Sequence, residues 1–208
     1  MTTNKKKARI AVLISGGGTN LQALINSEKR GELKSGEIVL VISNSPSAYG
    51  LKRAEKAGIH ALVIEKKFFG AQKAFEEELK RVLCENDIEL VILAGFLAIL
   101  SKDFTDSFPN RIINVHPSLI PSFCGEGYYG IKVHEEALKK GVKITGATVH
   151  FVNEIPDGGV IILQKAVKVF EDDTPEILQK RVMRLAEWQL LPKAAEKVCA
   201  EIINRNGD

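Results

Sequence analysis

Apolar runs alternate with amphipathic stretches through the first half of the chain. The run at 8–14 is rich in β-branched residues and predicts a strand, and a helix is expected from about Thr19, after a glycine-rich turn. Further strands are predicted at 37–43, 60–64, 88–94 and 111–116, and further helices at 48–57 and 71–86. Near-continuous apolar strands separated by helices are typical of parallel sheets covered on both sides. We therefore predict an α/β fold with an open, mostly parallel, twisted sheet and helices on both faces.

The pattern changes after Pro117, where a loop rich in glycine, proline and aromatic residues extends to about Gly130. A short helix to about Lys140 is expected next. Two strand-like runs, at 145–152 and 160–169, then flank a Pro-Asp-Gly-Gly turn. This arrangement predicts an antiparallel hairpin in the C-terminal part of the sheet.

The last part of the chain predicts one long helix. Thr174 is suited to the N-cap and Pro175 to the first helical position, and the helix is expected to run toward Ile203. Neither a repeat nor a linker interrupts the chain, so we expect a single domain over 1–208. Its first residues, 1–7, are expected to form a flexible basic tail.

Composition and charge limit the classes of partner. Hydrophobic residues make up 45% of the chain and charged residues 26%, as is usual for soluble globular proteins. The formal net charge of +3 is too small to indicate nucleic acid or a membrane surface as a partner. The longest apolar run, 90–100, is shorter than the roughly 20 residues of a membrane-spanning helix. We expect small-molecule substrates, and a monomer or homodimer.

The cysteines and histidines do not predict a metal site. The three cysteines are far apart, and their number and spacing fit the reduced thiols of a cytoplasmic protein. The four histidines show no HExxH-type pairing. These residues are Cys84, Cys124, Cys199, His60, His116, His134 and His150. We therefore expect no bound metal.

The glycine turn, residues 15–20, reads Ser-Gly-Gly-Gly-Thr-Asn. Its backbone amides and the following helix N-terminus favour an anion. A dinucleotide motif fails, because Leu21 replaces its last glycine and Ser43-Asn44 stands where an acidic residue would bind the ribose. A Walker loop is excluded too, since no Gly-Lys-Ser/Thr follows. We predict a single phosphate monoester as the ligand; the alternative is a tight turn without one.

Asn114 and His116 form a second candidate site. They are two residues apart at the end of a predicted strand, so both point to one side at the C-terminal edge of the sheet, where ligands bind. An amide and an imidazole together could stabilise an oxyanion in acyl transfer, although a structural histidine is the alternative. Asp157, in the Pro-Asp-Gly-Gly turn, is a third candidate or simply a turn former.

The order of these segments resembles the glycinamide ribonucleotide (GAR) formyltransferases of purine synthesis. The resemblance covers about 9–192, and its strongest parts are 14–22, 93–96, 113–121, 150–152 and 157–159. It implies a Rossmann-like formyltransferase fold. It also implies transfer of the formyl group of 10-formyltetrahydrofolate to the amine of GAR, which gives formyl-GAR and tetrahydrofolate.

The resemblance implies a role for each matching residue. Asn114, His116 and Asp157 correspond to the catalytic set, with His116 as general acid. The residues implied for GAR are Gly18, Thr19 and Asn20 at the phosphate and Glu187 at the ribose. The residues implied for folate are Leu97, Ala98, Ile99, Leu100, Asn114, Val152, Asn153, Glu154, Ile155, Pro156 and Asp157. Ala98 departs from the family pattern, which often has an arginine there; backbone contacts to the pterin do not require that side chain.

The chemistry expected of these residues is direct transfer. The amine attacks the formyl carbon, and protonated His116 and the Asn114 amide stabilise the charge that develops on the formyl oxygen. Asp157 is expected to raise the pKa of His116 and to help relay the proton that the amine loses. Neither a metal nor a covalent intermediate is needed, so Cys124 is assigned no nucleophilic role.

Three alternatives make different demands on the sequence. Methionyl-tRNA formyltransferases carry a C-terminal extension for tRNA, which we do not expect in a chain of this length and small net charge. Formyltetrahydrofolate hydrolases have an extra regulatory domain and typically read His-His-Ser where this chain has His116-Pro117-Ser118. A nucleotide-sensing module without catalysis would use the glycine turn but would not need Asn114, His116 and Asp157 together.

Overall fold

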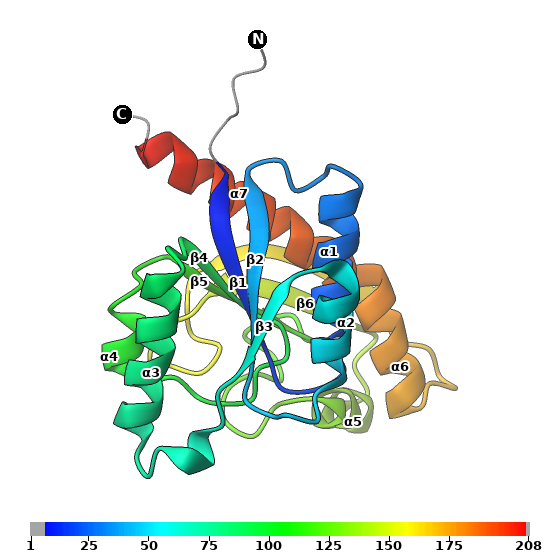
Figure 1. The fold of residues 1–208 in the computed structure, drawn as a ribbon. Coiled ribbons are helices and arrows are strands. Elements are labelled where there is room, and N and C mark those ends of the chain that lie inside the picture. The colour runs from blue at the N-terminus through cyan, green and yellow to red at the C-terminus, as the bar shows by residue number, and fades with distance from the viewer. Residues whose placement is uncertain (1–6, 207–208) are drawn as a thin grey trace.

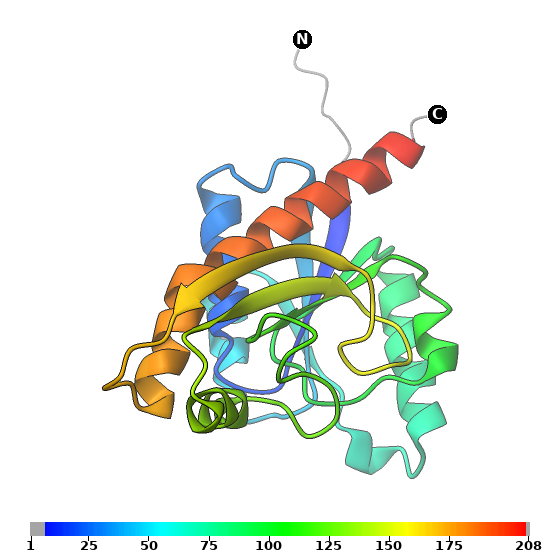
Figure 2. The ribbon, with the colours of Figure 1, turned by 180° about the vertical axis from the view of Figure 1, so that it is seen from behind.

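The computed structural model describes residues 7–206, so the expected basic tail lies outside the described residues except for Lys7. One seven-stranded sheet has the order β3-β2-β1-β4-β5-β6-β7. The strands are β1 (Ala8–Ile14), β2 (Gly36–Ser43), β3 (His60–Val63), β4 (Leu90–Leu93), β5 (Ile112–His116), β6 (Ile144–Phe151) and β7 (Ile161–Lys168). The pairs among β1 to β5 are parallel, whereas β6 and β7 are antiparallel to their neighbours. The predicted α/β fold with a C-terminal hairpin is therefore confirmed (Figures 1 and 2).

The helices connect the strands much as the sequence predicts. They are α1 (Thr19–Lys29), α2 (Tyr49–Ala57), α3 (Gln72–Glu85), α4 (Lys102–Thr105), α5 (Ile131–Lys140), α6 (Pro175–Val182) and α7 (Trp188–Asn206). A short 3-10 turn at Lys66–Phe68 and the single turn of α4 are not expected from the sequence. α2 ends at Gly58 in a left-handed conformation, and the Thr174 side chain caps α6 by accepting the Ile177 N–H, as predicted.

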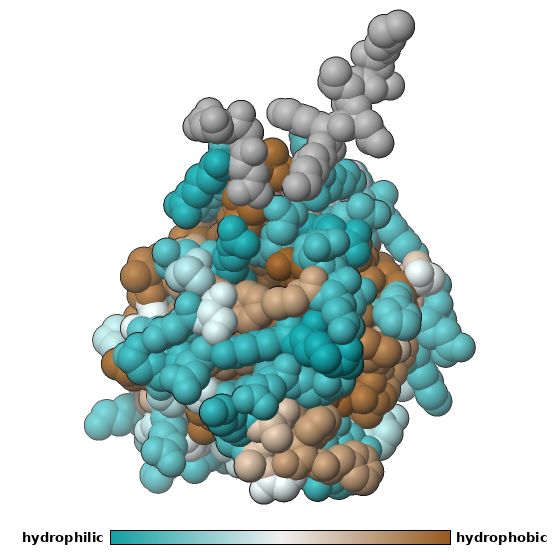
Figure 3. Space-filling view, turned by 60° about the vertical axis from the view of Figure 1, so that its left-hand side comes forward, coloured by the Kyte–Doolittle hydropathy of each residue, from teal (hydrophilic) through white to brown (hydrophobic). Residues whose placement is uncertain are grey.

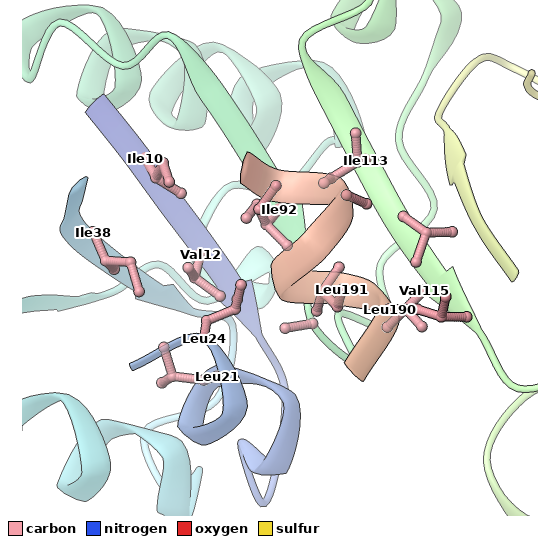
Figure 4. Packing of buried hydrophobic residues seen from close by; sticks show 14 of the residues in the cluster. Ile10, Val12, Leu21, Leu24, Ile38, Ile92, Ile113, Val115, Leu190 and Leu191 are labelled. Carbon is pink, nitrogen blue, oxygen red and sulfur yellow. The ribbon is translucent and has the colours of Figure 1, made fainter. Parts of the chain in front are cut away.

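Successive strand residues point to opposite faces of the sheet, and in the central strands the residues of both faces are apolar. Helices therefore cover both faces. Val12 packs in the cluster that contains α1, α2, α6 and α7, while Leu13 packs in the cluster that contains α3 and α4. Figure 4 shows the first cluster, in which Ile92 from β4 and Leu191 from α7 lie between the sheet and the helix. The face that carries α3 is mainly hydrophilic on its outer side, with smaller apolar areas (Figure 3).

The predicted single C-terminal helix is wrong in one respect. A π-helical turn, Met183–Glu187, separates α6 from α7. This segment consists of residues that are compatible with an ordinary α-helix, so the sequence carries no local signal for the wider turn. Such turns occur frequently at functional sites, and this one places Glu187 in the lining of a cavity of about 730 Å³ beside the sheet, the large cavity below.

The chain reverses its direction across the sheet between β1 and β4. β2 and β3 lie on one side of β1, and β4 and β5 lie on the other. The loops that leave β1 and β4 therefore diverge at the C-terminal edge, the lower edge in Figure 1. Ligands bind at such a switch point in open α/β sheets, so these two loops are the first place to look for a site.

Candidate functional site

The glycine turn leaves β1 at the switch point and is held tightly against the start of α2. Gly18 has φ 66°, a left-handed conformation that favours glycine. A Cβ atom at Gly18 would lie 2.6 Å from the Gly50 Cα, and the Gly50 N–H donates to the Gly16 carbonyl at 3.0 Å. Two glycines are therefore required where α2 meets the turn.

Arg53 holds the same turn from α2. Its Nε donates to the Gly17 carbonyl at 2.8 Å, and a terminal nitrogen donates to the Gln22 side chain at 3.0 Å. Its guanidinium also lies 5.1 Å from the centre of the Tyr49 ring. The carbonyl groups of Gly16 and Gly17 thus face α2. This arrangement supports the expectation that the amides at the start of α1 are available to an anion.

The second loop at the switch point, residues 95–101, follows β4 and will be called the wall loop. The Leu97 N–H donates to the Ser15 hydroxyl oxygen at 2.9 Å, and the Ser15 N–H donates to the Gly95 carbonyl at 3.1 Å. Leu97 and Ile99 are 64% and 65% exposed, whereas Phe96 and Leu100 are buried. The wall loop is therefore joined to the glycine turn and presents apolar side chains to the outside.

Asn114, His116 and Asp157 come together, as the sequence predicts. β5 supplies the first two, and Asp157 lies in the turn after β6. The Asp157 carboxylate lies 3.3 Å from His116 Nδ1 and accepts a hydrogen bond from Asn114 Nδ2 at 3.4 Å. Asp157 has φ 56°, a strained conformation that aspartate tolerates better than most residues and that is often found at functional sites.

His116 is buried and has an acceptor at each ring nitrogen. Nε2 lies 2.8 Å from the Phe123 carbonyl oxygen, which only accepts, and Nδ1 faces Asp157. Burial lowers the pKa of His116 below its usual value, and it outweighs the opposite influences of the Asp157 carboxylate and the Phe123 carbonyl. The raised pKa expected from the sequence is thus wrong for the free protein. The expected direction of the Asp157 contribution is right, but it does not dominate.

Asp157 is ionised in this site. Burial opposes its charged form, but the neighbouring imidazoles of His150 and His116 and the Gly125 N–H together lower the pKa of Asp157 below its usual value. The Gly125 amide donates to the carboxylate at 2.9 Å. Asp157 is therefore a fixed anion that can stabilise a proton on His116.

A cavity of about 730 Å³ joins this cluster to part of the predicted GAR site. Asn114, His116 and Asp157 line it together with Asn20 and Glu187. Of the other predicted GAR residues, Thr19 lines a separate cavity of about 270 Å³ beside α1, and Gly18 is buried against Gly50.

Glu187 and Asn20 form a buried polar pair in the large cavity. Asn20 Nδ2 donates to the Glu187 carboxylate at 2.8 Å, and Asn20 Oδ1 has no hydrogen-bond partner among the described residues. Burial raises the pKa of Glu187 to about 7, against the opposing hydrogen bond from Asn20. A ligand that carries hydroxyl donors would satisfy the free acceptor at Asn20.

The predicted folate residues surround an adjoining cavity of about 120 Å³. The wall loop supplies one side of it, and the turn after β6 supplies the other. Those that line it are Ala98, Ile99, Leu100, Asn114, Val152, Asn153, Glu154, Ile155, Pro156 and Asp157. Leu97 does not line this cavity but the 730 Å³ cavity, and Asn114 lines both. The structure thus brings the whole predicted set to one edge of the sheet, while the folate role of these residues stays a prediction.

Comparison with known proteins agrees with this geometry. Residues 8–195 match the family model described as formyl transferase. The chain belongs to the formyl transferase family. The resemblance to GAR formyltransferases is also confirmed by a phosphoribosylglycinamide formyltransferase of Haemophilus influenzae, which is 40% identical over 88% of this chain and 84% of its own length.

Other formyl transferase relatives extend this likeness. Glycinamide ribonucleotide transformylase 1 from Symbiobacterium toebii superposes with a TM-score of 0.88 at 38% identity, over 96% of this chain and 94% of that one. The human trifunctional purine biosynthetic protein adenosine-3 is 47% identical over 94% of this chain. The chain spans only 19% of that human protein.

His150 is a site residue of this formyl transferase to which the sequence pattern assigns no role. Its Nδ1 lies 2.7 Å from the Phe151 carbonyl, so Nδ1 carries the proton in the neutral ring, and Nε2 lies 3.3 Å from Asn114 Nδ2. Nε2 is also 3.4 Å from the Asp157 carboxylate. Its place opposite Asn114 in the antiparallel pair of β5 and β6 is the signal that strand register could have supplied.

His134 on α5 is also buried beside the large cavity. Neither ring nitrogen has a hydrogen-bond partner among the described residues. Burial, together with the charge of His116, lowers the pKa of His134 to about 4. Within 7–206 no group of three or more histidine, cysteine or acidic side chains could hold a metal, and no helix is long and apolar enough to cross a membrane.

Proposed function

We propose that this formyl transferase moves the formyl group of 10-formyltetrahydrofolate to the amine of GAR in de novo purine biosynthesis. The products are formyl-GAR and tetrahydrofolate. The observation that carries the proposal is the Asn114, His116 and Asp157 cluster, which lines one cavity together with Asn20 and Glu187. In this proposal the cluster acts between the regions assigned to the two substrates, as a reaction of two substrates requires.

The phosphoribosyl part of GAR is assigned to the glycine turn and Glu187. A phosphate at the N-terminus of α1 would accept from the amides of Gly18, Thr19 and Asn20. A ribose hydroxyl would donate to Glu187 or to the free Asn20 oxygen. The glycinamide amine then extends along the cavity toward Asn114 and His116.

The folate is assigned to the smaller cavity between the wall loop and residues 152–157. Its pterin would bond to backbone groups there, which are independent of side-chain identity at Ala98. The formyl group would reach the mouth shared with the larger cavity, because Asn114 and Asp157 line both.

The reaction forms a carbon–nitrogen bond from the amine to the formyl carbon and breaks the bond from that carbon to the folate nitrogen. The Asn114 amide and the His116 Nε2–H donate to the formyl oxygen as it gains charge. The formyl oxygen must then take the place of the Phe123 carbonyl as the acceptor of His116 Nε2. Asp157 stabilises the imidazolium and helps to pass the amine proton toward the leaving folate nitrogen.

A steady-state assay tests this proposal. Purified protein is mixed with GAR and 10-formyltetrahydrofolate, and loss of the formyl group from the folate is followed together with formation of formyl-GAR. We expect turnover that depends on both substrates and falls by about a hundredfold or more in His116→Ala. Release of formate without GAR would indicate a hydrolase instead. Binding of ribonucleotide without turnover would favour a sensing module.

We further propose that the enzyme acts in the cytoplasm on small molecules alone, as a monomer or homodimer. The proposal of a reducing compartment rests on the number and spacing of the three cysteines. Gel filtration combined with light scattering measures the number of subunits, and the same assay with formyl acceptors such as charged initiator tRNA tests the restriction to small substrates.

A further inference from the structure

Glu76 on α3 is a buried carboxylate outside the cluster described above. It is only 4% exposed, and among the described residues no cation forms an ion pair with it. A buried carboxylate is costly unless its oxygens accept hydrogen bonds. The groups that donate to Glu76 therefore show what this residue holds in place.

The donors to Glu76 either belong to the C-terminal end of the wall loop or are hydrogen-bonded to it. Glu76 Oε1 accepts from the Ser101 N–H at 2.7 Å and from Gln72 Nε2 at 2.5 Å, and Oε2 accepts from the Ser101 hydroxyl. The same Gln72 nitrogen donates to the Ile99 carbonyl at 3.0 Å. The Ser101 hydroxyl oxygen, in turn, accepts the Phe104 N–H and caps α4.

The wall loop needs such support because two of its apolar side chains, Leu97 and Ile99, are exposed rather than packed in the core. Leu97 and Ile99 face outward and line the cavities, whereas Phe96, Leu100 and the half-buried Ala98 pack against the core. The hydrogen bonds from α3 come from Glu76 and Gln72, and neither residue lines the 120 Å³ cavity. They fix the backbone without occupying the space that a ligand would use.

We propose that Glu76 is a positioning residue for folate binding. It sets the backbone of residues 98–101, and through it the carbonyl and amide groups presented to the pterin. The inference rests on the proposed function, because it assigns the wall loop to the folate. The glycine turn touches the wall loop at the other end, where Leu97 meets Ser15, so the GAR side is little affected.

Glu76→Gln tests this inference. Glutamine has nearly the same shape but offers one acceptor oxygen, and its amide nitrogen faces a donor, so at least one bond to Ser101 or Gln72 is lost. We expect the Kd for tetrahydrofolate, measured by calorimetry, and the KM for the formyl donor to rise about tenfold. The KM for GAR should stay within about twofold, and kcat at saturation within about threefold. A general loss of structure would not separate the two substrates in this way.

Glu77→Gln is the matched control. Glu77 is the next residue of α3, and its side chain is 63% exposed. Among residues 7–206, its one ion pair is a 4.0 Å contact with Lys73. The change removes the same charge from the same helix, so it reports any general electrostatic effect. We expect it to leave the Kd for tetrahydrofolate and both KM values unchanged.

Ser101→Ala keeps the inference testable if Glu76→Gln does not fold. It removes only the hydroxyl and should raise the Kd for tetrahydrofolate about threefold. In the double variant, Ser101→Ala should add little, because its partner is already altered. Equal changes in both KM values, or an unchanged Kd for tetrahydrofolate in folded Glu76→Gln, would overturn the inference. If the unaltered protein neither binds tetrahydrofolate nor transfers formyl, the proposed function fails instead.

Discussion

The glycine turn and the wall loop leave neighbouring strands at the same switch point, but only the turn is packed backbone against backbone. The turn is fixed through its backbone, by the close approach of Gly18 to Gly50 and by bonds from α2 to its carbonyls. The wall loop is fixed by side chains of α3, and its own residues Leu97 and Ile99 remain exposed.

This difference predicts different tolerance to change. Where a backbone is packed against another backbone, an added methyl group has no space, whereas an exposed loop position accepts a new side chain. The turn should therefore be sensitive to substitution at Gly18, and the wall loop to substitution of its anchors on α3. Ser15 is the exception, because its hydroxyl belongs to the turn but supports the wall loop at Leu97.

Gly18→Ala should have the largest effect. The left-handed conformation alone costs about 1–2 kcal/mol for a residue with a Cβ, and the 2.6 Å approach to Gly50 adds to it. We expect the KM for GAR to rise about a hundredfold, with a smaller change for the folate. Steady-state kinetics with each substrate in turn measures both values.

Gly17→Ala is the control for that substitution. Nothing lies within 4 Å of a Cβ atom at Gly17, and its φ is not in the left-handed region. The free energy of unfolding, measured in urea, should therefore change by less than about 0.5 kcal/mol. If both variants are destabilised equally, tight packing against α2 does not govern the turn.

Asp157→Asn should change the pH dependence of catalysis, and it should affect the KM values of both substrates alike. The Asp157 carboxylate raises the pKa of His116 against the stronger effect of burial, so its removal lowers that pKa further. Less imidazolium then remains at a given pH, and the alkaline limb of kcat/KM moves to lower pH by about one unit. NMR titration of His116 checks the sign; an unchanged pKa would reduce Asp157 to a turn residue.

Arg53→Met should weaken only the GAR side. It removes the bond to the Gly17 carbonyl and the bond to Gln22, together with the guanidinium that lies 5.1 Å from the centre of the Tyr49 ring. We expect the KM for GAR to rise about fivefold and the KM for the folate to stay constant. Lys52→Met, one residue away and exposed, removes the same charge from the same ring, which Lys52 Nζ approaches to 5.9 Å, but leaves the bonds to Gly17 and Gln22 in place. Equal effects of the two variants would indicate long-range attraction of the phosphate.

The local features of both loops could be predicted from the sequence, because they depend on neighbours along the chain. Strand periodicity indicates β1 and β5, the glycines indicate the turn, and the spacing of Asn114 and His116 indicates their common side. The contacts that hold the loops could not be found in this way. Arg53 is 36 residues from Gly17, and Glu76 is 25 residues from Ser101.

The direction in which the pKa of His116 is shifted could not be predicted from the sequence, for a related reason. A charged neighbour can be inferred from a motif, but the extent of burial depends on how the whole chain packs around the ring. The Phe123 carbonyl at Nε2 comes from a loop with no regular pattern. The π-helical turn at Glu187 likewise has no local signal, and it only becomes apparent when α6 and α7 are packed on the sheet.

Ala98→Arg should have the smallest effect and is the sharpest test of the wall loop. Ala98 is half-buried and borders a cavity of about 630 Å³ as well as the two cavities of the proposed site, so a long side chain has room to turn away from the folate. The backbone anchors at Gln72 and Glu76 remain unchanged. If the wall loop binds the pterin through its backbone, the KM for the folate should change by less than about threefold, and the KM for GAR should not change. Isothermal calorimetry with tetrahydrofolate measures the same affinity without turnover. A gain of about tenfold or more would contradict backbone binding. It would show that the arginine often found in this family contributes directly to folate affinity, and that this chain does without it.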